Sequence, residues 1–234
     1  MGSDPYKDAY AQYDEEPQHR VALRAFDIAV HPVTVAEYAC FVRTTGREAP
    51  TGDDNNRYSV SWQTQICDRL EHPVVMVSWF DAVAYTAWLS ERTGQSWRLP
   101  SEAEWEKAAR WDATTGQERI YPWGDTFEAD RCNTLESNKG KTTPVGSYPD
   151  GASPCGAQDM TGNVWEWTSS RFKSYPFDDE EGFLSTQAAD TRVLRGCFWG
   201  GVGTYGRAAS RFDVGPDLEI NSHGFRVMRE VTSS

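Results

Sequence analysis

Three short segments in the last third of the chain constrain its fold more than any other feature. They read GNVWEWT over 162–168, RVLRG over 192–196 and GFRV over 224–227, and each is a strand-like piece beside a glycine. Similar pieces occur at 121–125 and 144–147. The stretches between these pieces show no helical periodicity, which predicts long ordered loops.

The first half of the chain carries different signals. A partly alternating run over 21–30 predicts a strand, and three helices are predicted over about 34–46, 78–94 and 101–110. Each helix begins at a Ser or Thr, and in the first and third a Glu follows three residues later, the spacing of a capping box. Glycines lie at the end of the first two. Helices early and short antiparallel strands late indicate an α+β class.

We expect one domain over residues 21–230, preceded by a loose polar lead-in at 1–20. The chain has 234 residues, with ten each of Trp, Tyr and Phe, so a core built on aromatic side chains is feasible. Nineteen Gly and twelve Pro fit a fold with many turns and do not fit a pure helix bundle.

The formal charge of −12, without any cluster of Lys and Arg, argues against nucleic-acid binding. The acidic runs at 14–16 and 178–181 predict solvated loops, with an acidic binding patch as the alternative. Five cysteines, an odd number without a CxxC pair, argue against zinc and favour free thiols in a reducing, cytoplasmic compartment. No apolar run reaches the roughly 18 residues of a membrane span, and the polar N-terminus does not resemble a signal peptide.

A set of motifs over about 19–229 resembles the formylglycine-generating enzyme family, a branch of the C-type lectin fold. Besides the three C-terminal segments, the set includes HPVVMVSW at 72–79, RLPSEAEWE at 98–106, YPWGD at 121–125 and TPVGS at 143–147. Any one of these motifs alone is weak, whereas the whole set is specific. The resemblance implies a C-type lectin fold.

The residues that make the relatives enzymes are missing from this chain. Two cysteines bind copper in the formylglycine-generating enzymes, and the matching positions here are Gly200 and Tyr205, with Cys197 three residues too early. A soft ligand pair is needed for Cu(I), so the resemblance implies no such oxidase activity and no redox cofactor. The related sulfoxide synthases use a three-histidine iron site, and the four histidines here include no clustered pair.

The resemblance also implies structural calcium. The matching positions are Asp159, the carbonyls of Gly162 and Val164, and Glu166, a mixture of carboxylate and backbone oxygens that suits a hard cation. The alternative for Glu166 is a pair with an arginine. A second site of the family, at Asn133 and its neighbour, lacks its acidic partner here.

A non-enzymatic branch of this fold comprises the variable proteins of diversity-generating retroelements, in which AAC codons become NNC codons. Residues 192–228 form the candidate variable region. Within 197–223, the residues between the framework positions are all of types that NNC codons encode. Apolar side chains without periodicity indicate exposure, and exposed apolar patches mark binding sites. The predicted ligand-binding residues are Phe198, Trp199, Gly200, Gly201, Val202, Gly203, Tyr205, Phe212, Val214, Leu218, Ile220, Asn221, Ser222 and His223.

The hypothesis for function is non-catalytic binding of a protein ligand by a diversified C-terminal surface. For Phe198 and Phe212 the alternative is a place in the core. Arginines 195, 207, 211 and 226 are expected to brace the loops through bidentate hydrogen bonds. The alternative function is an oxidoreductase or accessory factor of the same fold with altered chemistry. A carbohydrate-binding module is disfavoured, because the lectin-type Glu-Pro-Asn motif is absent.

Overall fold

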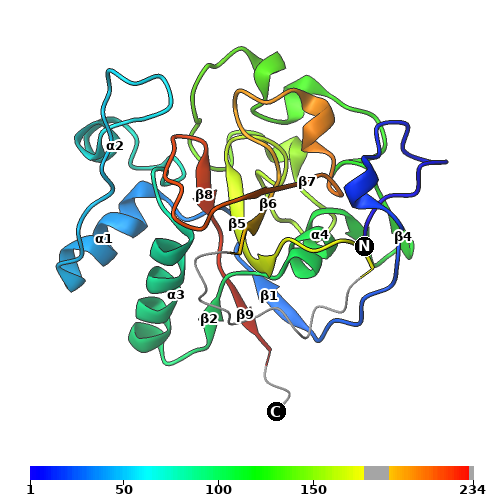
Figure 1. Cartoon of the computed structure of the whole chain (residues 1–234), viewed down its shortest axis with the longest axis horizontal. Helices are drawn as coiled ribbons and strands as arrows, with labels where there is room; N and C mark the ends of the chain where they lie inside the picture. The colour runs from blue at the N-terminus through cyan, green and yellow to red at the C-terminus, as the bar shows by residue number, and fades with distance from the viewer. Residues whose placement is uncertain (177–189, 232–234) are drawn as a thin grey trace.

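The computed structural model describes residues 1–176 and 190–231. The acidic run at 178–181 lies outside the described residues, so the interpretation of that run as a loop stays a prediction. The first three helices lie on one side of the molecule, and the fourth lies on the other side among short strands and long loops (Figure 1). This arrangement confirms the α+β class that the sequence predicts.

The helices begin and end where their capping signals place them. Helix α1 spans Val35–Thr45, α3 spans Trp79–Thr93 and α4 spans Glu102–Arg110, and each has a complete capping box. The first two end at left-handed glycines, with φ of 69° in both. A short helix that the sequence analysis missed, α2, spans Trp62–Asp68. Its seven residues are too few for a convincing periodicity.

The strands form three small sheets. One has the order β1-β9-β2, with β1 at Phe26–Ile28, β9 at Met228–Glu230 and β2 at Trp97–Arg98. A second is the hairpin of β3, Trp111–Asp112, and β4, Gln117–Glu118.

The third sheet, of order β7-β6-β5-β8, carries the C-terminal motifs. Its members are β5 at Trp165–Arg171, β6 at Arg192–Arg195, β7 at Arg211–Val214 and β8 at His223–Phe225. Its strands pair antiparallel, except that β5 and β8 run parallel, with Trp167 opposite Phe225. The parallel pair differs from the expectation, because local sequence carries no information on strand direction.

Several strand-like pieces turn out to be irregular. The strand expected over 21–30 is limited to β1, and the segment at 121–125 forms only an isolated bridge between Tyr121 and Gly124. The segment at 144–147 is not a strand. Short 3-10 helices lie in the long connections: η1 Tyr13–Glu15, η2 Ala129–Arg131, η3 Leu135–Ser137, η4 Pro149–Gly151 and η6 Gly203–Gly206.

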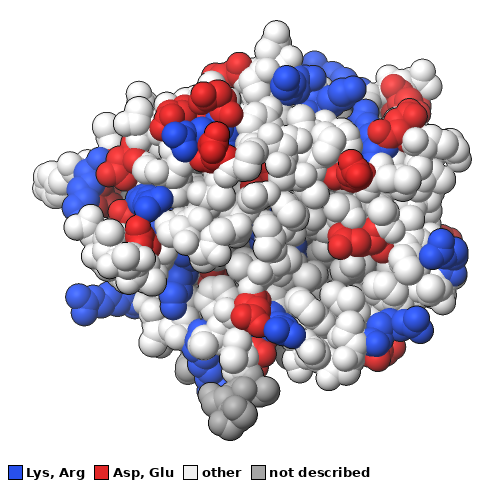
Figure 2. Space-filling view, turned by 180° about the vertical axis from the view of Figure 1, so that it is seen from behind, with Lys and Arg blue, Asp and Glu red and all other residues white. Residues whose placement is uncertain are grey.

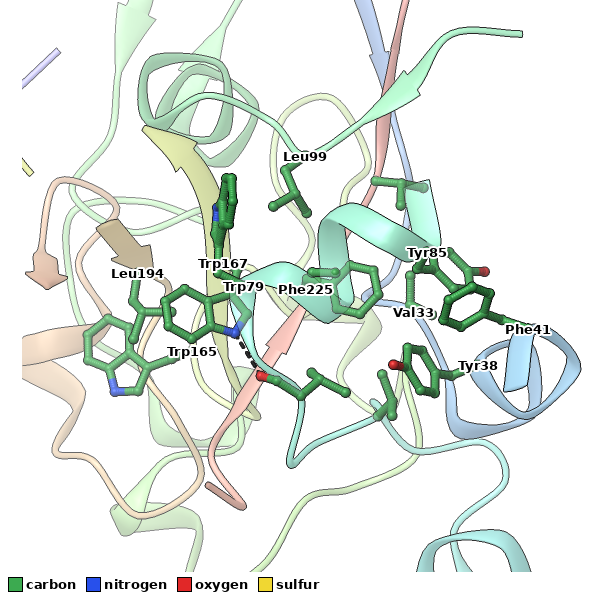
Figure 3. Close-up of a cluster of buried hydrophobic side chains, with 14 of the residues drawn as sticks. Val33, Tyr38, Phe41, Trp79, Tyr85, Leu99, Trp165, Trp167, Leu194 and Phe225 are labelled. Atoms are coloured by element: carbon green, nitrogen blue, oxygen red, sulfur yellow. Dashed lines mark hydrogen bonds between the residues drawn. The ribbon is translucent and has the colours of Figure 1, made fainter. Parts of the chain in front are cut away.

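The main core is aromatic and lies between α1, α3 and the third sheet (Figure 3). Phe225 packs edge-on against Tyr85, with ring centroids 5.3 Å apart, and Tyr85 stacks on Tyr38. The buried indole nitrogens also have partners, since Trp79 and Trp167 each donate to a backbone carbonyl at 2.9 Å. Such packing fixes the strands that carry the C-terminal loops.

The first 20 residues are not a loose lead-in, and the structure corrects that expectation. Asp8 and Glu15 are buried, and both carboxylates contact Arg207 at 2.7 Å. Gly2 donates its N–H to Glu106 of α4 at 2.9 Å. The polar composition of this segment therefore reflects buried ion pairs with the rest of the domain.

Two observations concern the exterior. On the face opposite to that of Figure 1, basic side chains occur in small groups next to acidic ones, without a continuous basic patch (Figure 2). Among the described residues there is no helix with the length and apolarity that crossing a membrane requires.

Candidate ligand-binding face

Bulky apolar side chains of the C-terminal loops reach solvent. Val202, Tyr205, Phe212 and Leu218 are 37%, 52%, 50% and 39% exposed. They come from η6, from β7 and from the loop between β7 and β8. Four exposed apolar side chains within residues 202–218 make this segment a candidate binding surface.

The strand β7 shows why one neighbour is exposed and the next is buried. Arg211 points inward and is 6% exposed, whereas Phe212 points outward, as the alternation of a strand requires. The Phe212 ring stacks on Trp165 of β5, with centroids 5.8 Å apart and planes 21° from parallel. Phe212 is therefore a preoriented aromatic group on the surface. Phe198 is half-buried against the core cluster. Its position is therefore intermediate between that of a core residue and that of an exposed ligand-binding residue.

Not every predicted ligand-binding residue reaches the surface. Gly201, Gly203, Ser222 and His223 are buried, so the structure removes these residues from the face. The other partly exposed members of the prediction are Phe198, Trp199, Gly200, Val214, Ile220 and Asn221. The face defined by the structure thus consists of these six residues and the four exposed ones, and we call it the C-terminal face.

Residues outside the candidate variable region extend this face. Leu135 is 55% exposed and donates its N–H to Gly201 at 2.9 Å. Tyr58 is 54% exposed, and its carbonyl accepts from the N–H of Asn221 at 3.0 Å. Nothing in the local sequence marks either residue, because only the tertiary fold brings them beside the C-terminal loops.

One buried guanidinium holds the backbone below the loops. Arg195 of β6 donates to the carbonyls of three consecutive residues, Ala208, Ala209 and Ser210, at 2.6 to 2.9 Å, and it pairs with Glu106. Burial opposes the charge of Arg195, but the carboxylates raise its pKa above the usual value. A charged group that satisfies three carbonyls fixes the path of the chain at 208–210.

Two further arginines fasten the same segment from either side. Arg211 forms a bidentate pair with Glu102 of α4, at 2.8 and 2.7 Å. Arg207 donates to both oxygens of Glu15 at 2.7 Å. The expected bracing role of the arginines is thus confirmed. Side chains on the C-terminal face can change without altering these contacts, because none of the three carboxylate partners lies on the face.

The two buried thiols near the face are poor ligands and nucleophiles. Burial raises the pKa of Cys197 and of Cys132 to about 12. Both side chains are at most 2% exposed, so each thiol stays protonated at neutral pH. Gly200 and Tyr205, which the resemblance matches to copper ligands, offer no thiol.

The residues matched to calcium ligands fit a cation only in part. Glu166 accepts from Arg226 on both oxygens and from the Trp105 indole at 2.7 Å, so three of its roughly four acceptor positions are filled. The alternative of an arginine partner is therefore realised. Asp159 is buried, burial raises its pKa, and one of its oxygens accepts from Gly146. Calcium stays a prediction that depends on Asp159 and the two carbonyls.

The four histidines do not converge. Within residues 1–176 and 190–231, no three His, Cys, Asp or Glu side chains are grouped so that they could hold a metal. Burial lowers the pKa of His223 to about 4, and burial with two nearby cations lowers that of His72 to about 4. The buried Nδ1 of His223 lacks a hydrogen-bond partner, which suits a neutral ring.

Fold and face together define a C-type lectin-like α+β domain that displays irregular loops on a braced scaffold. Over residues 1–231 the chain matches the sulfatase-modifying factor enzyme 1-like domain. The chain belongs to this family, which confirms the resemblance seen in its motifs.

The relatives of known function include both active and inactive members. A hercynine oxygenase of Mycolicibacterium thermoresistibile is 36% identical over 228 residues, covering 85% of this chain and 49% of the relative. The inactive C-alpha-formylglycine-generating enzyme 2 of Bos taurus is 37% identical over 178 residues, covering 69% of this chain and 51% of the relative. The chain thus spans about half the length of these relatives.

Two solved structures share the fold. PvdO from Pseudomonas aeruginosa superposes with a TM-score of 0.82 at 30% identity, covering 99% of this chain and 90% of PvdO. Treponema denticola variable protein 1 superposes with a TM-score of 0.72 at 21% identity, covering 98% of this chain and 91% of that protein. The second likeness concerns the fold alone.

Proposed function

We propose that this chain is a non-catalytic binding protein whose C-terminal face contacts a protein ligand. One observation carries the proposal: Val202, Tyr205, Phe212 and Leu218 are exposed on loops whose backbone is held from below by buried arginines. A surface that is already ordered loses little entropy on binding. Exposed aromatic rings give a large contact area at low entropic cost.

We further propose that the face is diversified, as in the variable proteins that share the fold. The bracing contacts involve α4, β6 and the N-terminal segment, so exchange of the exposed side chains leaves the scaffold unchanged. The free state of all five cysteines supports our proposal of a reducing, cytoplasmic compartment.

Population sequencing of the coding region tests the proposal of diversification. We expect substitutions confined to adenine-containing codons of the exposed positions, with a matching unmutated repeat nearby. The codons for Arg195, Arg207 and Arg211 serve as internal controls, since the bracing contacts require them. Uniform sequence at the exposed positions would exclude diversification.

A second candidate function is supported by the similarity to hercynine oxygenase. An oxidoreductase or accessory role with altered chemistry would need groups beyond those seen on the C-terminal face. Oxygen consumption with thiol substrates, measured separately with added iron and added copper, distinguishes the two candidates. Oxygen consumption that depends on the added metal would favour the oxidoreductase, and no consumption with either metal would favour the binding protein.

A further inference from the structure

A small recess adjoins the C-terminal face where the loop between β7 and β8 meets α1 and α3. The cavity has a volume of about 340 Å³, and its lining includes Tyr38, Arg47, Glu48, Asp81 and Glu219. Glu219 of the lining lies between Leu218 and Ile220 in the sequence, so the recess shares its loop with two residues of the face.

The charges of the recess do not balance. Arg47 directs both Nε and Nη2 to one oxygen of Asp81, at 3.0 and 2.7 Å. The second oxygen of Asp81 accepts from the Ser78 hydroxyl and N–H as part of the helix cap. Asp81 and Arg47 thus neutralise each other, and Glu48 and Glu219 add two further negative charges.

Glu219 is a partly exposed carboxylate whose charge is not paired among the described residues. Within the described parts of the chain, no hydrogen bond or ion pair is found for its carboxylate. Burial raises the pKa of Glu219, and the nearby charge of Asp81 raises it further. A cation beside this carboxylate would offset both effects, since opposite charge favours the ionised form.

We infer that this recess receives one basic side chain, an arginine or lysine of the protein ligand, with Glu219 as its ion-pair partner and Tyr38 as part of the wall. The inference rests on the proposed function and names a feature of the partner. The Tyr38 side chain is almost fully buried and is fixed by stacking on Tyr85, so the wall exists before binding. Charge pairing at the margin of an apolar face sets the orientation of a partner.

Small probes test the recess without any protein ligand. The neutral, nearly isosteric counterpart of acetyl-arginine amide is acetyl-citrulline amide, in which a carbonyl oxygen replaces one charged NH₂ group. At low salt, we expect acetyl-arginine amide to shift the backbone NMR signals of 47–51 and to lower the pKa of Glu219, followed by carboxylate ¹³C shifts. Citrulline should do neither.

Two variants provide the matched comparison. Glu219→Gln should weaken the binding of acetyl-arginine amide by up to about fivefold, the upper end for an exposed ion pair. Asp217→Asn removes an exposed carboxylate two residues away, outside the recess, and should leave the affinity within about twofold. Thermal denaturation verifies that both variants fold.

Acetyl-lysine amide is tested in parallel. Three results would overturn the inference: equal shifts with citrulline, equal weakening by the two variants, or no shift with either acetyl-arginine amide or acetyl-lysine amide. The probe experiment is independent of diversification. If the recess binds the probe but population sequencing shows uniform codons at the exposed positions, this inference stands and the proposal of a diversified face is excluded.

Discussion

Arg226 holds both carboxylate oxygens of Glu166, with Nε 2.6 Å from Oε2 and Nη2 2.7 Å from Oε1, and neither side chain reaches solvent. Arg226 also donates to the carbonyls of Ala29 and Gln158. The pair therefore joins β5, the segment after β1 and the loop before the GNVWEWT motif. This one contact thus links two of the motifs, GNVWEWT at 162–168 and GFRV at 224–227.

Removal of either Glu166 or Arg226 should lower the stability of the fold strongly. We expect Glu166→Ala to lower the free energy of unfolding by about 3–5 kcal/mol, because it leaves the Arg226 charge buried without a partner. The control is Asp27→Asn in the exposed pair with Arg229, where the side chains are 52% and 38% exposed. That change should cost less than about 1 kcal/mol. Urea denaturation in EDTA measures the unfolding free energy of both variants. Equal losses would contradict the burial of the Glu166–Arg226 pair.

Side chains of the C-terminal face should matter little for stability. We expect Tyr205→Ala to change the free energy of unfolding by about 0.5 kcal/mol at most, as is usual for surface positions. Phe212→Ala should cost about 0.5–1.5 kcal/mol, the value of its stacking on Trp165. Phe225→Ala, at a fully buried ring, should cost about 3–5 kcal/mol. A loss for Tyr205 or Phe212 as large as that for Phe225 would make them core residues.

The elements predicted from sequence are those whose signals are local. Thr34, Ser78 and Ser101 each cap a helix through a residue three positions later, so the bounds of α1, α3 and α4 follow from short stretches of chain. The lead-in shows the opposite case. Asp8 and Glu15 find their partner in Arg207, 199 and 192 residues away, and no local pattern encodes such a pair.

For the candidate site, too, local sequence predicted only the features that do not depend on tertiary contacts. Irregular apolar composition identified Tyr205 and Phe212 as exposed residues, and the arginines of the motifs identified the bracing groups. The contributions of Tyr58 and Leu135 depend on loops that meet only in the folded chain. The sequence analysis did not predict the burial of His223. This residue is buried because its strand, β8, pairs with β5, and local sequence does not indicate that pairing.

Asp159 allows a test of calcium. Burial raises the pKa of this carboxyl, while the Gly146 N–H and the Arg226 charge lower it. A carboxyl with a raised folded pKa contributes most stability below its unfolded pKa of 3.8, and loses that contribution as pH rises through the folded value. The raised pKa of Asp159 therefore means that this buried carboxyl lowers the stability of the cation-free protein at neutral pH, relative to acid pH.

We expect Asp159→Asn to retain or raise the melting temperature in EDTA. Its φ of 56° is tolerated by asparagine. Calcium should raise the melting temperature of the parent protein and leave that of the variant unchanged, since binding to the folded state alone is stabilising. Equal responses to calcium would show that Asp159 is not a ligand, and no response in the parent would remove the calcium prediction.

The buried ring of His223 should make stability depend on pH. Its folded pKa of about 4 lies below the ordinary value of 6.5, because burial disfavours the charged ring. The unfolded chain therefore binds more protons between these values. Stability from the neutral ring is complete above pH 6.5 and is lost as pH falls toward 4. The slope from one such group is about 1.4 kcal/mol per pH unit.

Replacement of the ring isolates this contribution. His223→Phe keeps an aromatic group for the edge-on contact with Trp167, whose centroid is 5.4 Å away, and removes the titration. We expect the slope of the unfolding free energy between pH 6.5 and 4 to decrease by about one proton. His72→Gln should decrease the slope by a similar amount, since the pKa of His72 is also lowered to about 4. An unchanged slope in His223→Phe would mean that the folded protein protonates His223 as readily as the unfolded chain does.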